Sequence, residues 1–182
     1  MSPVQHLCTA EQFRNAPGNE HSELIRGEVV DVAPSGFEHG SISNNLGRLL
    51  GNFVVENRLG VVTGSEAGYL IGRNPDTVRA PDIGFVRQER LGEAPIPGFF
   101  PGPPDLAVEV LSPNDLASEL LAKVHDWLDS GCRAVWVVDP RAKTVTIYEP
   151  GRPVWALGKA GRIESPDLLP GFSLSVADIF TP

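Results

Sequence analysis

Two carboxylates stand at energetically costly positions in this sequence. Glu109 interrupts the apolar run from Leu106 to Leu111, where we expect a strand that is buried on both faces. Asp82 follows Pro81 and opens a second short apolar segment that ends at Val86. A buried carboxylate costs free energy unless it is paired, hydrogen-bonded or bound to a metal ion. Two such acids at the ends of neighbouring strands could share one Mg²⁺, which takes carboxylate oxygens and activates water for attack on phosphate.

Lys123 is the candidate third member of this site. It lies on the helix predicted after Glu109, at the border of the apolar stripe, where its ammonium could orient water or stabilise charge on phosphate. The simpler alternative is a surface ion pair with Glu119, one helical turn earlier. The two acids also have a simpler interpretation, as helix caps or as partners of Arg79 or Arg133. Spacing alone leaves these alternatives open.

Glu23 and His39 are the remaining polar residues that could take part. Glu23 begins the first predicted strand pair and could add a carboxylate, and His39 precedes the first long helix, where it could cap the helix or contact substrate. A solvated structural role is the simpler interpretation of each. Ser35 and Ser112 have no paired histidine in a recognisable elbow, and no glycine-rich phosphate loop is present.

The elements that must position these residues alternate between strands and helices. A short helix near Thr9–Phe13 is predicted from a capping box of Thr9 and Gln12. A strand pair over 24–32 turns at Arg26-Gly27, and a helix spaced from Ile42 to Phe53 follows it. Residues 61–71 are expected to form another hairpin, and 95–104, with five prolines, an extended loop without regular structure.

The segment from Leu106 to Val138 predicts a parallel crossover. A buried strand leads to a helix capped by Ser112 with Pro113 in its first turn, which stops at Gly131 before the strand Ala134 to Val138. Residues 145–148 return as a partner strand. We therefore expect a mixed α/β (α+β) fold, in which antiparallel hairpins flank a small parallel unit.

The composition predicts one soluble domain over residues 1–182. Apolar residues make up 41% of the 182, and no run is long enough to span a bilayer. Without a secretory layout at the N-terminus we expect a cytoplasmic protein, and Cys132 is expected to be a small core residue. The net charge of −8 and pI of about 4.9 are unusual for a nucleic-acid-binding protein, because phosphate contacts normally need a basic surface.

Taken together, several segments resemble the Uma2 family of restriction-endonuclease-like proteins over nearly the whole chain. In chain order these segments are Glu23-Leu24-Ile25-Arg26-Gly27-Glu28, His39 with Ile42 and Leu46, Ala80-Pro81-Asp82-Ile83, Glu109-Val110-Leu111-Ser112-Pro113, Lys123, Ala134-Val135-Trp136-Val137-Val138-Asp139-Pro140, Leu169-Pro170-Gly171-Phe172 and Ile179-Phe180. The resemblance implies the PD-(D/E)XK nuclease fold, a central mixed β-sheet flanked by helices.

The resemblance also implies roles for individual residues. The motif maps onto Pro81-Asp82 and Glu109, but the usual E-x-K pattern would put lysine at 111, where this chain has Leu111. In this family the following helix supplies the lysine, which implies that Lys123 is catalytic and makes Glu23 a fourth member. The implied metal ligands are Asp82, Glu109 and the Leu111 carbonyl, with Mg²⁺ or Mn²⁺ as the cofactor.

The function expected from these residues is metal-dependent hydrolysis of DNA phosphodiester bonds. The acidic composition keeps open a catalytically inactive module that binds nucleic acid or protein, and a hydrolase of small phosphate compounds is a third alternative. A homodimer is expected by analogy with nucleases that pair two sites to cut two strands, and no membrane association is expected.

Overall fold

The computed structural model describes residues 7–113 and 115–181. Its centre is a six-stranded mixed sheet, in the spatial order β11-β10-β9-β8-β6-β3. The strands of this sheet are β3 (Gly60–Gly64), β6 (Ile83–Arg87), β8 (Leu106–Val110), β9 (Ala134–Asp139), β10 (Thr144–Tyr148) and β11 (Trp155–Leu157). Of its neighbouring pairs, β8 and β9 run parallel and the others run antiparallel, so the predicted parallel crossover is confirmed.

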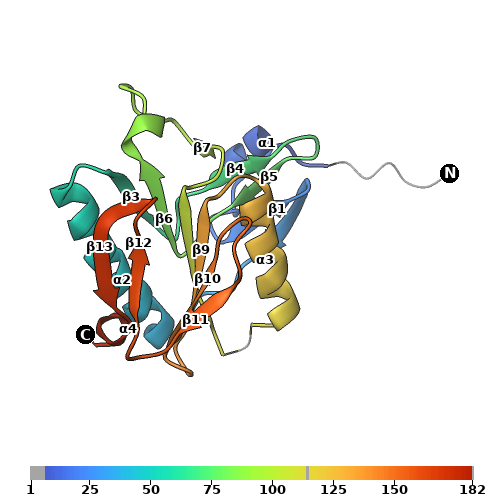
Figure 1. Cartoon of the computed structure of the whole chain (residues 1–182). Helices are drawn as coiled ribbons and strands as arrows, with labels where there is room; N and C mark the ends of the chain where they lie inside the picture. The colour runs from blue at the N-terminus through green and yellow to red at the C-terminus, as the bar shows by residue number, and fades with distance from the viewer. Residues whose placement is uncertain (1–6, 114, 182) are drawn as a thin grey trace.

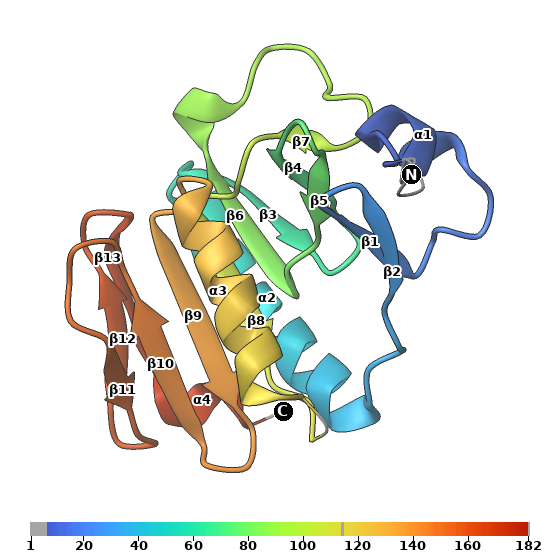
Figure 2. The same ribbon diagram turned by 90° about the vertical axis from the view of Figure 1, so that its right-hand side faces the viewer.

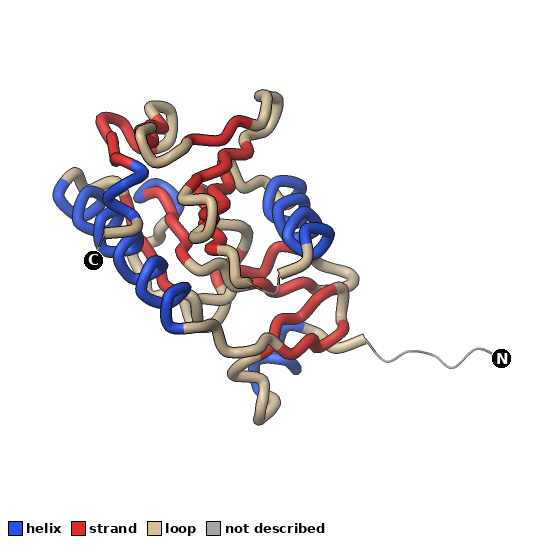
Figure 3. The backbone as a smooth tube through the Cα atoms, turned by 90° about the horizontal axis from the view of Figure 1, so that it is seen from below, coloured by secondary structure: helices blue, strands red, loops and turns tan. Residues whose placement is uncertain are grey.

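Two helices cover the two faces of this central sheet, and Figures 1 and 3 show them on opposite sides of it. Helix α2 (Phe37–Glu56) packs on the face that carries Val108 and Val110, and α3 (Ala117–Asp129) packs on the face that carries Ala107. Alternate residues of β8 face opposite helices, and every one of them is buried. The predicted mixed sheet flanked by helices is therefore confirmed.

A second sheet of five short strands stands beside the first, in the order β2-β1-β5-β4-β7 (Figure 2). Its strands are β1 (Ser22–Ile25), β2 (Glu28–Asp31), β4 (Tyr69–Gly72), β5 (Thr77–Arg79) and β7 (Phe100–Pro101). The predicted turn between β1 and β2 is confirmed, because Arg26 and Gly27 both have positive φ values, 50° and 81°. That geometry suits a tight hairpin and favours glycine at the second position.

The remaining elements are short, and all of them except a 3₁₀ helix in the middle of the chain lie towards its two ends. They are α1 (Ala10–Asn15), the 3₁₀ helix η1 (Gln88–Arg90), β12 (Arg162–Ser165), β13 (Leu169–Ser175) and α4 (Val176–Ile179). The predicted capping box of α1 is present, since Gln12 N donates to Thr9 Oγ1 and Thr9 N to Gln12 Oε1. Cys132 is buried in the core, as predicted. Over the described residues, no helix combines the length and the apolar character that crossing a membrane would require.

Three sequence predictions about local structure were wrong. The segment 61–71 is not a hairpin, because β3 pairs with β6 in the central sheet while β4 pairs with β5 and β7 in the other. The proline-rich segment does contain regular structure, the two-residue strand β7. Pro101 has no N–H to donate, but the pairing does not need one. Phe100 N donates to the Gly68 carbonyl, and Gly102 N donates to the Leu70 carbonyl on β4.

The third error concerns the start of α3. The helix begins at Ala117 instead of near Ser112 and Pro113. Ser112 N donates to Asp115 Oδ2 at 2.8 Å and Asp115 N donates to the Ser112 carbonyl at 3.2 Å, so these residues close a turn that precedes the helix, whose N-cap is Leu116. A side chain that caps a turn competes with the helix for the same backbone groups.

Packing of α2 on the central sheet predicts a large effect of truncation at Leu46. This side chain is fully buried among core residues, so Leu46→Ala should lower the free energy of unfolding by about 2–5 kcal/mol. Leu121→Ala, at an exposed site on α3, is the matched control and should change it by less than about 0.5 kcal/mol. Urea unfolding measures both, and equal effects would contradict the described packing.

Candidate active site

Glu109 lies near the end of β8, and α3 provides hydrogen-bond donors to both of its carboxylate oxygens. Trp127 Nε1 donates to Oε1 at 2.8 Å, and Lys123 Nζ lies 2.9 Å from Oε2. Burial disfavours the ionised form and raises the pKa of Glu109. Lys123 opposes this shift, while the nearby charge of Asp82 adds to it. The sequence prediction of a buried charge at this position is therefore correct, and α3 supplies its compensation.

The ammonium of Lys123 lies among three oxygens from different elements. Besides Glu109, it lies 3.6 Å from Glu23 Oε1 and donates to the Ala80 carbonyl at 3.3 Å. Burial alone would lower the pKa of Lys123, but attraction to Glu109 and Glu23 outweighs burial and raises it. Within the described chain Lys123 forms no ion pair with Glu119, so the alternative of a surface pair along the helix is not observed.

Glu23, on β1, contacts a second cation of the cluster, the guanidinium of Arg79. Arg79 Nη1 donates to Glu23 Oε2 at 2.6 Å, and Ala80 N donates to Oε1 at 3.1 Å. The same guanidinium donates through Nε and Nη2 to Asp126 Oδ2, at 2.9 and 2.6 Å. Arg79 thus joins the five-stranded sheet to α3 and pairs with these two acids, instead of with Asp82 or Glu109.

Asp82 lies directly before β6, on the other side of the cluster. Its Oδ2 accepts the Val110 N–H at 2.7 Å and lies 3.1 Å from His39 Nε2. The prediction that His39 precedes the helix was wrong, because His39 lies within the first turn of α2, whose N-cap is Gly36. Ile83 pairs with Val108, so continuing this antiparallel register by one residue sets Asp82 opposite Glu109. The hydrogen bond to Asp82 raises the pKa of His39 against the opposing effect of burial.

At the end of β8, the backbone N–H groups of Val110 and Leu111 point towards opposite edges of the strand. Leu111 N–H donates to the Val138 carbonyl at 2.8 Å, towards β9. Val110 N–H points to the opposite edge of the strand, where it meets Asp82. In extended backbone the N–H and C=O of one residue leave on the same side, so the Val110 carbonyl faces the Asp82 edge.

The charges of this cluster do not balance. Glu23, Asp82, Glu109 and Asp126 carry four negative charges when ionised. Arg79 and Lys123 carry two positive charges and Arg26, 3.9 Å from Asp126, carries a third, so the sum is −1 while His39 beside Asp82 is neutral. Among residues 7–113 and 115–181, no group of three or more His, Cys, Asp or Glu side chains is arranged to hold a metal ion. A site of two carboxylates, a backbone carbonyl and water uses fewer side-chain ligands than such a group, and its oxygen donors suit Mg²⁺.

Sequence reasoning did not assign Asp126 or Trp127 to the site, although both contact its members. The signal was present in the spacing, because these residues follow Lys123 by three and four positions. Residues at that spacing lie on one face of a helix. A lysine that points towards Glu109 therefore brings both side chains with it.

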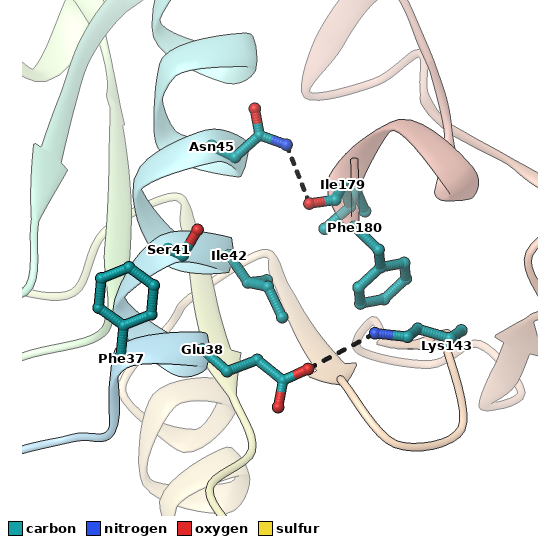
Figure 4. A pocket seen from close by; sticks show the side chains of 8 residues that line it. All are labelled: Phe37, Glu38, Ser41, Ile42, Asn45, Lys143, Ile179 and Phe180. Carbon is teal, nitrogen blue, oxygen red and sulfur yellow. Dashed lines mark hydrogen bonds and ion pairs between the residues drawn. The ribbon is translucent and has the colours of Figure 1, made fainter. Parts of the chain in front are cut away.

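A separate pocket of about 210 Å³ lies between the first turns of α2 and the α4 segment (Figure 4). Ile42 and Phe180 provide apolar walls, and Lys143 lies 3.7 Å from Glu38 at the rim. Asp82, Glu109 and Lys123 are not among the residues that line it. The carboxylate cluster and this pocket are therefore distinct features of the protein.

The raised pKa of Glu109 predicts how stability depends on pH. Between the ordinary value of 4.5 and the raised value of about 7, the folded protein binds more protons than the unfolded chain. This group therefore lowers the free energy of unfolding as the pH rises through that window. Glu109→Gln removes the titration, so wild type should lose stability relative to this variant from pH 4.5 to 7. A stability difference that stays constant in urea unfolding at successive pH values would contradict this assignment.

Comparison with known proteins gives a family and a fold. No protein with a curated functional description matches the chain. A crystal structure described as "a putative nuclease belonging to DUF820", from Anabaena variabilis ATCC 29413, superposes with a TM-score of 0.83. The two sequences are 22% identical, and the match covers 95% of this chain and 97% of that chain. At this identity the likeness establishes a common fold.

The sequence profile of the Uma2 family, described as "Putative restriction endonuclease", matches residues 10–177. That range begins in α1, ends in α4 and includes every residue of the carboxylate cluster. The resemblance inferred from the sequence segments is thus confirmed, and the chain belongs to the Uma2 family.

Proposed function

We propose that this protein is a nuclease that hydrolyses DNA phosphodiester bonds with Mg²⁺ or Mn²⁺ at the cluster around Asp82 and Glu109. The observation that carries the proposal is the contact of 2.9 Å between Lys123 Nζ and Glu109 Oε2, in a cluster where the ion-pair partner of Asp82 among the described residues is His39. A divalent cation would compensate for the negative charges of Asp82 and Glu109. Membership of the Uma2 family, which is described as "Putative restriction endonuclease", supports the reaction class.

Asp82 and Glu109 would hold the metal ion through carboxylate oxygens. The hydrogen bonding favours the Val110 carbonyl as the third protein ligand over that of Leu111, because Val110 faces the Asp82 edge of β8. When bound, the ion supplies positive charge that acidifies water and neutralises phosphate oxygens. Glu23 stays fixed by Arg79 and accepts a hydrogen bond from a water of the site.

Lys123 supplies the mobile positive charge of the reaction. Hydrolysis adds one water across the P–O bond: the water oxygen bonds to phosphorus, the bond to the leaving sugar oxygen breaks, and that oxygen ends as a hydroxyl. The Lys123 ammonium donates to the attacking water or to a phosphate oxygen as negative charge develops there. A homodimer, expected from analogy with other nucleases of this fold, would bring two such sites to the two strands of a duplex.

The test of the proposed function is cleavage of nucleic acids by matched variants. Wild type is incubated with single-stranded DNA, duplex DNA and RNA in the presence of Mg²⁺, Mn²⁺ or EDTA. Metal-dependent cleavage of DNA is expected for wild type and for Glu119→Gln, which removes an exposed acid from α3. Asp82→Asn with Glu109→Gln should lose it. Cleavage that survives the double substitution would show that another site acts, and absence of cleavage by wild type would favour the inactive binding module.

Lys123→Met separates metal binding from catalysis. The variant removes an ammonium that competes with a metal ion for Glu109, so Mn²⁺ should bind at least as tightly as to wild type. Cleavage should nevertheless fall by about 10²-fold or more, because the charge that stabilises the transition state is lost. Calorimetry with Mn²⁺ and rate measurements on DNA provide the two readouts. A variant that cleaves like wild type would remove Lys123 from the mechanism.

A further inference from the structure

Among residues 7–113 and 115–181, Trp127 contributes the one hydrogen bond to the Glu109 side chain that comes from a neutral side chain. We propose that Trp127 is a positioning residue, whose indole N–H holds the Glu109 carboxylate in the orientation that binds the metal ion. The inference rests on the proposed function, since it assigns to Glu109 a metal-binding role. It extends that function to a residue outside the family motif.

The two groups that donate hydrogen bonds to Glu109 differ in charge. Trp127 Nε1 lies 2.8 Å from Oε1, and Lys123 Nζ lies 2.9 Å from Oε2. A carboxylate has about four acceptor positions, so two remain for a cation when both donors are in place. The indole is uncharged and can only donate, so it does not repel an incoming cation. The ammonium of Lys123 is positively charged and does repel an incoming cation.

The surroundings make Trp127 the less mobile of the two donors. Its ring is fully buried and packs in a T-shaped arrangement with Tyr69, with centroids 6.1 Å apart and planes at 85°. Tyr69 is held in turn by a hydrogen bond of 2.7 Å between its hydroxyl and Thr63 Oγ1. Lys123 keeps a quarter of its side chain exposed and has a flexible stem. Lys123 can therefore move aside when a metal ion binds, while Trp127 continues to hold Oε1.

The chain offers a matched control at Trp136. This side chain is also fully buried, and its ring stacks on Phe172 with centroids 6.1 Å apart. Its Nε1 has no hydrogen-bond partner within the described residues. Substitution of either tryptophan by phenylalanine shortens a buried ring, but only Trp127→Phe also removes a hydrogen bond to Glu109.

The first experiment compares Mn²⁺ affinity of wild type, Trp127→Phe and Trp136→Phe by calorimetry, together with cleavage kinetics. Loss of a residue that orients a metal ligand typically weakens metal affinity or activity about 10- to 100-fold, which is the loss expected for Trp127→Phe. Its kcat should fall while the KM for DNA stays unchanged. Trp136→Phe should match wild type in all three quantities. Equal metal affinities of the two variants would overturn the positioning role.

The second experiment uses the unaltered protein, so it does not depend on the variants folding. The three tryptophans give three indole N–H signals in a ¹⁵N-labelled sample. Titration with Mg²⁺ should shift the Trp127 signal more than the signals of Trp136 and Trp155, and a Trp127 signal that moves no more than the others would overturn the inference. If wild type binds no Mn²⁺, the proposed function fails and the positioning role with it. If wild type binds and the two variants bind equally, only the positioning role fails.

Discussion

A carboxylate buried inside a sheet needs compensation for its charge, and Glu109 is the residue on which the rest of the site depends. Its strand is buried on both faces, so solvent cannot provide that compensation. Helix α3 provides it instead, with Lys123 on one oxygen and Trp127 on the other. The same helix face carries Asp126, which fixes Arg79 and through it Glu23. One buried charge thus determines where α3 must pack and which polar residues it must present.

Much of the fold was predictable because its signals are local. The capping box of Thr9, the turn at Arg26-Gly27 and the apolar stripe of α2 all gave correct elements. The errors arose where tertiary pairing decided the structure. Residues 61–71 have the composition of a hairpin, yet their two strands pair in different sheets, and β7 exists only because β4 lies beside it. No local pattern encodes a distant partner.

The site could be predicted in part for a related reason. Glu109 was evident as a charge in an apolar run, and in the structure Lys123 lies within ion-pair distance of both Glu109 and Glu23. Spacing alone could not show whether Lys123 pairs with Glu109 or with Glu119, because a helix in this segment is compatible with either ion pair. The choice depends on how α3 is rotated against β8. Asp126 and Trp127 follow from that rotation, which is a property of packing and is absent from the sequence pattern.

In the proposed function, Asp82 and Glu109 bind one divalent cation between them. Anomalous diffraction from crystals soaked in Mn²⁺ tests it most directly, because manganese scatters anomalously and protein oxygens do not. We expect one anomalous peak within bonding distance of carboxylate oxygens of both residues, with the Val110 carbonyl as a further ligand and Lys123 displaced from Glu109. Absence of a peak between Asp82 and Glu109 at high Mn²⁺ concentration would contradict it, as would a peak bound by other residues alone.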